Sequence, residues 1–255
     1  MRIIEQTGGG LFGLYDRELY NSLPPVVPAD REFSQRPDTG RFFELAGQLI
    51  CEFDLETYVG VCLLHKHNFV DTDEIMVESL EILEEGKPAL VMALTKDGES
   101  SDFIPVNWKL GQSASERVFY PLEHSNIEAA KTGHAQLVAQ PEFLSRFRSL
   151  LIEFGYEDVI GLTLLRVQSL DRKADEHLVE RSHPNRIANV VTVEAQPPDA
   201  ATAFIKTNWS FRKNMIDAAG RCEVSCEVVT VCRPDDDKHI EEKGHDKFHI
   251  SGQKV

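Results

Sequence analysis

Basic residues are scarce in this 255-residue chain, with 27 lysines and arginines against 42 aspartates and glutamates. The formal charge is therefore −15 at pH 7. Nucleic-acid backbones and anionic membranes repel a protein of that charge, so we expect neither as a partner. An acidic excess serves solubility in many proteins, and it also suits a surface that docks on a basic partner.

The chain also lacks segments that would place it in or beyond a membrane. No apolar run is long enough to span a bilayer, and the start, MRIIEQTGGG, has no apolar core of a secretory signal. The five cysteines are odd in number, and Cys51 and Cys62 lie in strongly apolar runs, which is typical of reduced, buried thiols. We expect a cytoplasmic protein.

Signatures of the common catalytic classes are missing as well. The sequence has no phosphate-binding P-loop, no Gly-x-Ser-x-Gly elbow, no HExxH zinc motif and no kinase signature. Gly8 to Gly13 fit the pattern GxGxxG, but the segment that follows soon meets Pro24 and Pro25, and no parallel βαβ unit continues beyond it. We therefore interpret these glycines as a flexible loop and expect no bound nucleotide.

What the chain does contain is an internal repeat. At a constant offset of 101 residues, the stretch 49–69 matches 150–170, and Phe103–Trp108 matches Phe204–Trp209. Between these blocks, with one residue inserted, Glu78 meets Glu180. Two blocks in register are difficult to obtain by chance, so the sequence indicates a tandem duplication. The identities in the first block are Leu49/Leu150, Glu52/Glu153, Phe53/Phe154, Glu56/Glu157, Gly60/Gly161, Leu63/Leu164 and Leu64/Leu165.

Each copy opens with an amphipathic helix and continues in strands. Apolar residues recur at helical spacing over 42–53 and again over 143–154. The runs 58–64 and 159–165 are apolar on both faces, as in central strands. Further strands are expected at 74–77, 89–94, 103–110 and 117–120, and in the second copy at 190–194, 204–211 and 222–232. The residues expected in the core are Phe53, Leu63, Trp108, Phe154, Leu164 and Trp209.

These elements predict an α+β fold with an internal tandem duplication. Each half would be one amphipathic helix plus a mainly antiparallel sheet, and the halves would pack about a pseudo-twofold axis as one compact domain. The alternative is two independent lobes. The predicted parts are an N-terminal arm at 1–37, with residues 21–37 extended, repeat 1 at 38–121, a linker at 122–140, repeat 2 at 141–232 and a polar tail at 233–255.

Polar residues interrupt the apolar strand face at matched points of the two copies. If the first strand extends from Tyr58 to Phe69, His65 and His67 lie on one face, and their counterparts are Arg166 and Gln168. Buried polar groups need partners, so these four residues predict a catalytic or binding pocket between the halves. The alternative is that each strand simply leaves the core there and meets water.

The two histidines are candidates for metal ligands or for a general acid and base. Residues two apart on a strand point the same way, so both imidazoles can reach one divalent ion, zinc or iron. Arg166 would hold an anionic group of a substrate, and its charge disfavours a metal unless an anion lies between them. The matched Glu78 and Glu180 can reach such a site, but spacing does not decide it. Candidates for a third ligand are Asp71, Glu74, Glu123, His124 and His183.

Two classes of function follow from the sequence. The first is a small-molecule-binding protein, an enzyme in the favoured form, that takes a polar or anionic ligand. The second is an acidic interaction protein without catalysis, such as an inhibitor or immunity-type partner of a basic protein, using the acidic stretch 71–85. A concave pocket with converging polar side chains favours the first class, and a flat acidic face favours the second. Substrate, reaction and oligomeric state stay open.

Overall fold

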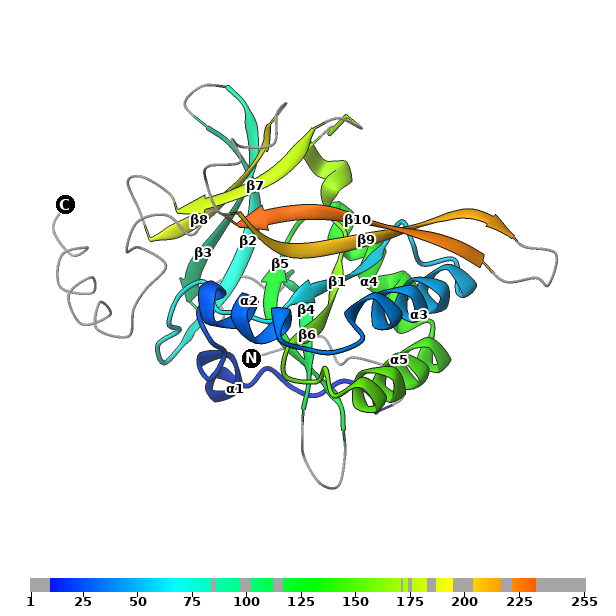
Figure 1. Ribbon diagram of the computed structural model, residues 1–255. Helices are drawn as coiled ribbons and strands as arrows, with labels where there is room; N and C mark the ends of the chain where they lie inside the picture. Colours follow the sequence, from blue (N-terminus) through cyan, green and yellow to red (C-terminus); the bar gives the residue numbers. More distant parts are fainter. Residues whose placement is uncertain are drawn as a thin grey trace, which may run out of the picture.

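The fold is one closed β-barrel with helices on its outside (Figure 1). The computed structural model describes residues 10–83, 86–96, 102–111, 117–170, 172–173, 176–182, 187–194, 204–216 and 222–232. The helices are α1 (Arg17–Asn21), α2 (Val26–Ser34), α3 (Thr39–Glu52), α4 (Glu128–Val138), α5 (Pro141–Phe154) and the 3₁₀ turn η1 (Val167–Leu170). The strands are β1 (Val59–Leu63), β2 (Glu74–Ile82), β3 (Pro88–Lys96), β4 (Ile104–Leu110), β5 (Phe119–Ser125), β6 (Ile160–Leu164), β7 (His177–Ser182), β8 (Ala188–Glu194), β9 (Ile205–Ile216) and β10 (Cys222–Cys232).

The strand order around the barrel is β1-β6-β4-β5-β2-β3-β8-β7-β10-β9, and β9 pairs again with β1. The pairs β2–β5 and β7–β10 are parallel, and the other pairs are antiparallel. When each of β1–β5 is exchanged for its counterpart in β6–β10, the same order is obtained by following the barrel in the opposite direction. The register repeats too, since Cys62 faces Asn208 while Thr163 faces Asn107, each 101 residues from its counterpart.

The predicted α+β class with a separate sheet in each half is wrong. Both neighbours of β1 belong to the second copy, namely β6 and β9, and β6 likewise pairs with β1 and β4. The strands of both copies therefore form one barrel instead of two sheets packed face to face. The apolar runs correctly indicated strands buried on both faces, but a periodicity records burial and does not say which strand lies alongside.

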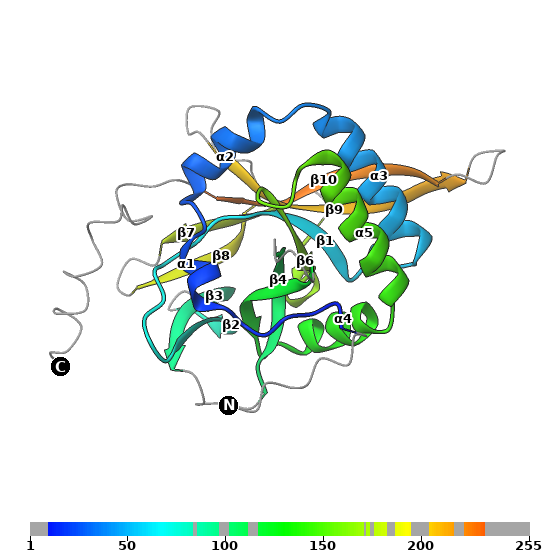
Figure 2. The ribbon, with the colours of Figure 1, turned by 90° about the horizontal axis from the view of Figure 1, so that it is seen from below.

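Helices α3 and α5 lie side by side on the outside of the barrel (Figures 1 and 2). Each forms where the helical spacing predicted it, because its apolar stripe can pack against the barrel and the other helix. Phe42 of α3 stacks on Tyr156 with ring centroids 4.5 Å apart, and Arg146 of α5 contacts Glu52 at 2.6 and 2.7 Å. Leu63, Trp108, Leu164 and Trp209 are buried as predicted, whereas Phe53 and Phe154 are only partly buried beside the core.

The N-terminal arm was predicted to be extended over 21–37, and this is wrong because α2 occupies Val26–Ser34. Pro25 caps this helix and Pro28 lies in its first turn. A proline is tolerated there because the N–H that it lacks would have no partner within the helix. Gly8, Gly9 and the tail 233–255 lie outside the described residues. Among the helices that are described, none has the length and apolar character needed to cross a membrane.

Candidate metal centre

A cavity of about 60 Å³, lined by both polar and apolar side chains, lies inside the barrel. That volume holds only a few water molecules, and it is well below the several hundred Å³ of a pocket for a drug-sized ligand. Its size therefore fits an ion with water or a molecule of a few heavy atoms. The polar residues that line it are His65, His67, Glu78, Asn107, Glu123, Thr163, Arg166, Glu180, Asn189, Asn208 and Thr230.

His65 and His67 lie in the loop after β1, not on a strand that continues to Phe69 as predicted. Strand β1 ends at Leu63, and the backbone then makes hydrogen bonds to other segments, including one from Lys66 N to Pro24 O at 3.0 Å. The loop still brings both imidazoles to one place, with ring centroids 4.6 Å apart.

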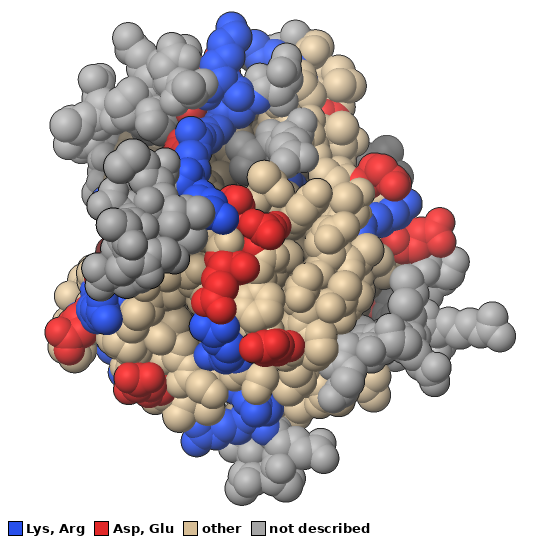
Figure 3. Space-filling view, turned by 90° about the vertical axis from the view of Figure 1, so that its right-hand side faces the viewer, with Lys and Arg blue, Asp and Glu red and all other residues tan. Residues whose placement is uncertain are grey.

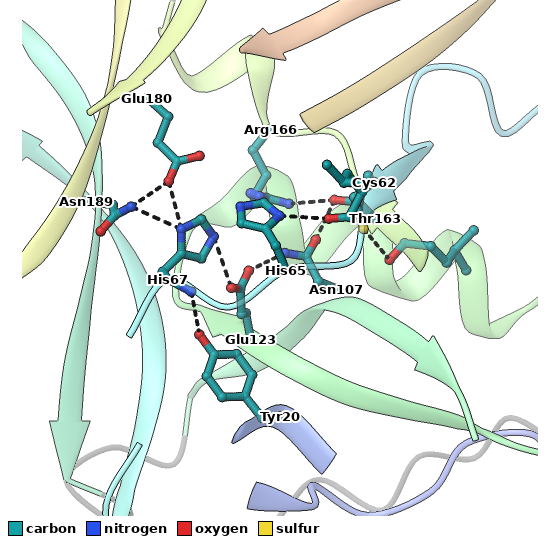
Figure 4. A network of polar contacts seen from close by, with 12 residues as sticks. Tyr20, Cys62, His65, His67, Asn107, Glu123, Thr163, Arg166, Glu180 and Asn189 are labelled. Atoms are coloured by element: carbon teal, nitrogen blue, oxygen red, sulfur yellow. Dashed lines mark hydrogen bonds and ion pairs between the residues drawn. The ribbon is translucent and has the colours of Figure 1, made fainter. Parts of the chain in front are cut away.

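The two histidines meet a glutamate from a strand that was not predicted, β7. One ligand atom each from His65, His67 and Glu180 lie within 4.8 Å of one another, and the three residues are 8%, 7% and 4% exposed. Figure 4 shows these side chains converging. Two imidazoles and one carboxylate from separate parts of the chain could hold a metal ion.

Neighbouring groups contact each of the three residues. His65 Nδ1 is 2.9 Å from Leu63 O, and a carbonyl oxygen only accepts, so Nδ1 carries the proton and Nε2 has the lone pair. Asn189 Nδ2 donates to Glu180 Oε1 at 2.7 Å and is 3.0 Å from His67 Nδ1. The His65 contact uses the ring nitrogen opposite the free one, as orienting contacts in metal sites do, whereas Asn189 contacts His67 Nδ1 and Glu180 Oε1 themselves.

His67 lies between two carboxylates. Its Nδ1 is 2.7 Å from Glu180 Oε1 and its Nε2 is 3.3 Å from Glu123 Oε1. Burial by itself would lower the pKa of His67, but the two carboxylates outweigh it and raise that pKa to about 9. Burial opposes ionisation of Glu180, yet His67 lowers the pKa of Glu180 well below its usual range. Burial raises the pKa of Glu123 despite the attraction of His67.

These pKa shifts predict how the metal-free protein responds to pH. The proton on His67 stabilises the fold fully below the ordinary pKa of 6.5, and this contribution is lost as the pH rises through about 9. The midpoint of thermal unfolding, measured with a chelator present, is expected to fall by several degrees between pH 7 and pH 10. His67→Gln should show a flatter profile. An equal fall in both proteins would contradict the assignment to His67.

Arg166 lines the same cavity but is held by the protein. Its Nε is 2.5 Å from Glu78 Oε1, and Nη1 donates to Leu164 O and, at 3.4 Å, to Thr163 Oγ1. Arg166 and Glu78 are the repeat counterparts of His65 and Glu180. In each case the basic residue of one copy faces the glutamate of the other.

A chain of buried hydrogen bonds joins the two sides of the cavity. Thr163 Oγ1 donates to Asn107 Oδ1 at 2.5 Å, and Asn107 Nδ2 donates to Glu123 Oε2. Because Arg166 contacts Thr163 and Glu123 contacts His67, the cavity is lined by one polar network (Figure 4). Every member of such a network constrains the orientation of its neighbours.

The sequence singled out two of the three residues in this group, His65 and His67. Gln168 lies in η1, where its side chain is outside the described part, and His183 is outside the described residues altogether. Of the other proposed third ligands, Asp71 is exposed and Glu74 is half-buried.

Two further candidates for the third ligand lie on β5. Glu123 touches His67 without belonging to the group of three, and His124 packs against Tyr15 with ring centroids 5.5 Å apart. The signal that could have found Glu180 is its match with Glu78 in the repeat. Glu180 also lies on the same face of β7 as the buried Leu178.

The donor set of this site is common to two kinds of metalloprotein. Zinc enzymes and non-haem iron enzymes both use two histidines and one carboxylate, with open positions for water or substrate. Comparisons with protein-family models, curated proteins and solved structures gave no match to this chain.

Proposed function

We propose that this protein binds one divalent metal ion, zinc or iron, at His65, His67 and Glu180 and presents it to a small polar molecule inside the barrel. The observation that carries this proposal is the convergence of three buried ligand atoms within 4.8 Å of one another. Such a cluster is costly to bury, so its burial favours a bound cation as partner.

The charges around the cavity support a cation. Three carboxyl groups, those of Glu78, Glu123 and Glu180, face the single guanidinium of Arg166. In the metal-free protein a proton on His67 supplies part of the missing positive charge, which is why the pKa of His67 is raised. A divalent ion would replace that proton and balance the remaining negative charge.

The ligand geometry needs a small adjustment to accept a metal. His67 Nδ1 and Glu180 Oε1 are 2.7 Å apart, which is a hydrogen-bond distance. Two ligands of a tetrahedral zinc ion lie about 3.3 Å from each other. Binding through these two atoms therefore requires them to separate by roughly 0.6 Å as the proton between them leaves, a shift that side-chain rotation can supply.

The substrate class follows from the size of the cavity and from Arg166. About 60 Å³ admits only a few heavy atoms beside an ion. Arg166 is the cation available to an anionic group of the ligand, but such a group would have to share it with Glu78. A small polar molecule, with water as the simplest case, therefore suits the site best. A bound metal lowers the pKa of water and polarises carbonyl oxygens, so catalysis in this site would be metal-assisted.

Elemental analysis of the purified protein tests the metal centre. We expect about one zinc or iron per chain, lost on treatment with a chelator and restored by titration with Zn²⁺, Fe²⁺ or Co²⁺. The midpoint of thermal unfolding should rise on reloading, because a ligand that binds only the native state stabilises it. Absence of metal in the purified protein, with no uptake of any of the three ions, would overturn the proposal.

An acidic interaction protein is the second candidate, and the position of its expected acidic stretch supports it less well than the cavity supports the first. Part of the stretch expected to form an acidic face lies in β2, where Ile75 to Glu78 are buried in the barrel wall. On the face drawn in Figure 3, acidic side chains lie beside basic ones, and a broad part of the surface carries neither.

A further inference from the structure

A short N-terminal segment, residues 20–24, holds the loop that carries His65 and His67. Asn21 makes two hydrogen bonds with the backbone of one loop residue. Its Nδ2 donates to Val70 O at 2.9 Å, and Val70 N donates back to Asn21 Oδ1 at 2.9 Å. A side chain that takes both the donor and the acceptor of Val70 fixes the backbone of the loop at its far end.

Further hydrogen bonds join the same two segments. Lys66 N donates to Pro24 O, and Lys66 Nζ donates to Asn21 O, both at 3.0 Å. His67 N donates to the hydroxyl of Tyr20 at 3.3 Å, a contact visible in Figure 4. Lys66, His67 and Val70 thus each donate a backbone N–H to this segment, so the segment constrains the position of the loop and of the His67 imidazole.

The same segment packs beside the cavity. Tyr20 and Leu23 are 0% and 3% exposed, and they pack in a small apolar cluster separate from the main core. The other buried members of that cluster are Leu64, Val70, Met76, Met92 and Leu122. Leu64, Met92 and Leu122 also line the polar cavity, so one side of the cavity wall packs against the N-terminal segment.

We infer that Asn21 is a positioning residue for the metal-ligand loop, and that docking of residues 20–24 and binding of the metal are one coupled equilibrium. This inference rests on the metal centre proposed above. A loop that is held in the ligating geometry loses less conformational freedom when the ion binds. Coupling between two sites is reciprocal, so the ion must in turn tighten the docking of the segment.

The first measurement is a Co²⁺ titration of Asn21→Ala, monitored by the visible absorption bands of the ion. We expect the affinity to fall about tenfold, as for partners that orient metal ligands, and the bands to shift because the loop geometry relaxes. Ser22→Ala is the matched control, since the Ser22 hydroxyl donates only to Leu19 O within α1. Tyr20→Phe keeps the buried ring and removes the hydroxyl that accepts from the backbone of the loop, including His67 N–H, so it should also weaken binding.

The second measurement is hydrogen exchange of residues 16–24 in the wild type with and without Co²⁺. Slower exchange in the presence of the ion is expected. Equal exchange in both states, or wild-type affinity in both Asn21→Ala and Tyr20→Phe, would overturn the coupling and leave the metal centre intact. Absence of Co²⁺ uptake by the wild type would instead overturn the metal centre and the coupling together.

Discussion

Replacing Glu180 by glutamine is expected to lower the affinity for Zn²⁺ or Co²⁺ by about 100-fold or more, since partners that merely orient ligands already contribute 10- to 100-fold. The substitution keeps the size of the side chain and removes the negative charge of the only carboxylate in the group of three. It also removes the strongest attraction on the His67 imidazolium, so the pKa of His67 should fall from about 9. Isothermal titration of chelator-treated protein measures the first effect.

The repeat supplies a matched control for this substitution. Glu78→Gln makes the same chemical change at the counterpart position, in the same cavity, where the carboxylate contacts Arg166 instead of the two histidines. It should retain most of the metal affinity, whereas His65→Ala combined with His67→Ala should abolish binding. Equal losses in Glu180→Gln and Glu78→Gln would show that the cavity attracts cations by its total charge and has no defined ligand set.

The largest loss of stability is expected from Gly60→Ala and Gly161→Ala, at glycines that lie close against a strand of the other copy. A Cβ on Gly60 would lie 2.3 Å from Trp209 O, and a Cβ on Gly161 would lie 2.5 Å from Trp108 O. Both obstacles are backbone atoms of strands that pair with β1 and β6, so relief requires the barrel wall to open locally. We expect each substitution to cost about 3 kcal/mol of unfolding free energy, the upper end of ordinary overpacking.

Gly133→Ala is the control for these substitutions. Gly133 lies within α4, and a Cβ there meets its nearest neighbour at 3.5 Å, an ordinary contact distance. Alanine at this position should stabilise the protein by about 1 kcal/mol because glycine is a poor helix former. Chemical denaturation of the three variants measures both signs. Wild-type stability of Gly60→Ala and Gly161→Ala would contradict the close strand crossing.

The counterpart positions of the repeat explain why one cavity contains two unlike clusters. His65 faces Glu180, and Arg166 faces Glu78, so both basic residues meet a glutamate of the other copy. The guanidinium is a permanent cation, whereas an imidazole can lose its proton and bind a metal. One side of the cavity is therefore neutralised within the chain, and the other is suited to an external ion.

The sequence by itself determined several local elements and residues that line the cavity. Helical spacing located α3 and α5, and apolar runs located β1 and β6, because each pattern records which faces are buried. Polar residues at matched points of the two copies predicted a cavity with His65 and His67, because a buried polar group requires a partner. These conclusions depend on short stretches of chain and hold in any fold that buries them.

Only the tertiary structure decided which segments meet. The repeat does not indicate that β1 pairs with β6 and β9. Two separate sheets are therefore as consistent with the sequence pattern as one closed barrel. The third member of the group, Glu180, is more than a hundred residues from His67, and spacing along a chain carries no information about such distances. Glu180 reaches the histidines because barrel closure turns the inner face of β7 toward the loop after β1. Strand pairing therefore brings together in one place residue types that can be identified in the sequence but lie far apart in it.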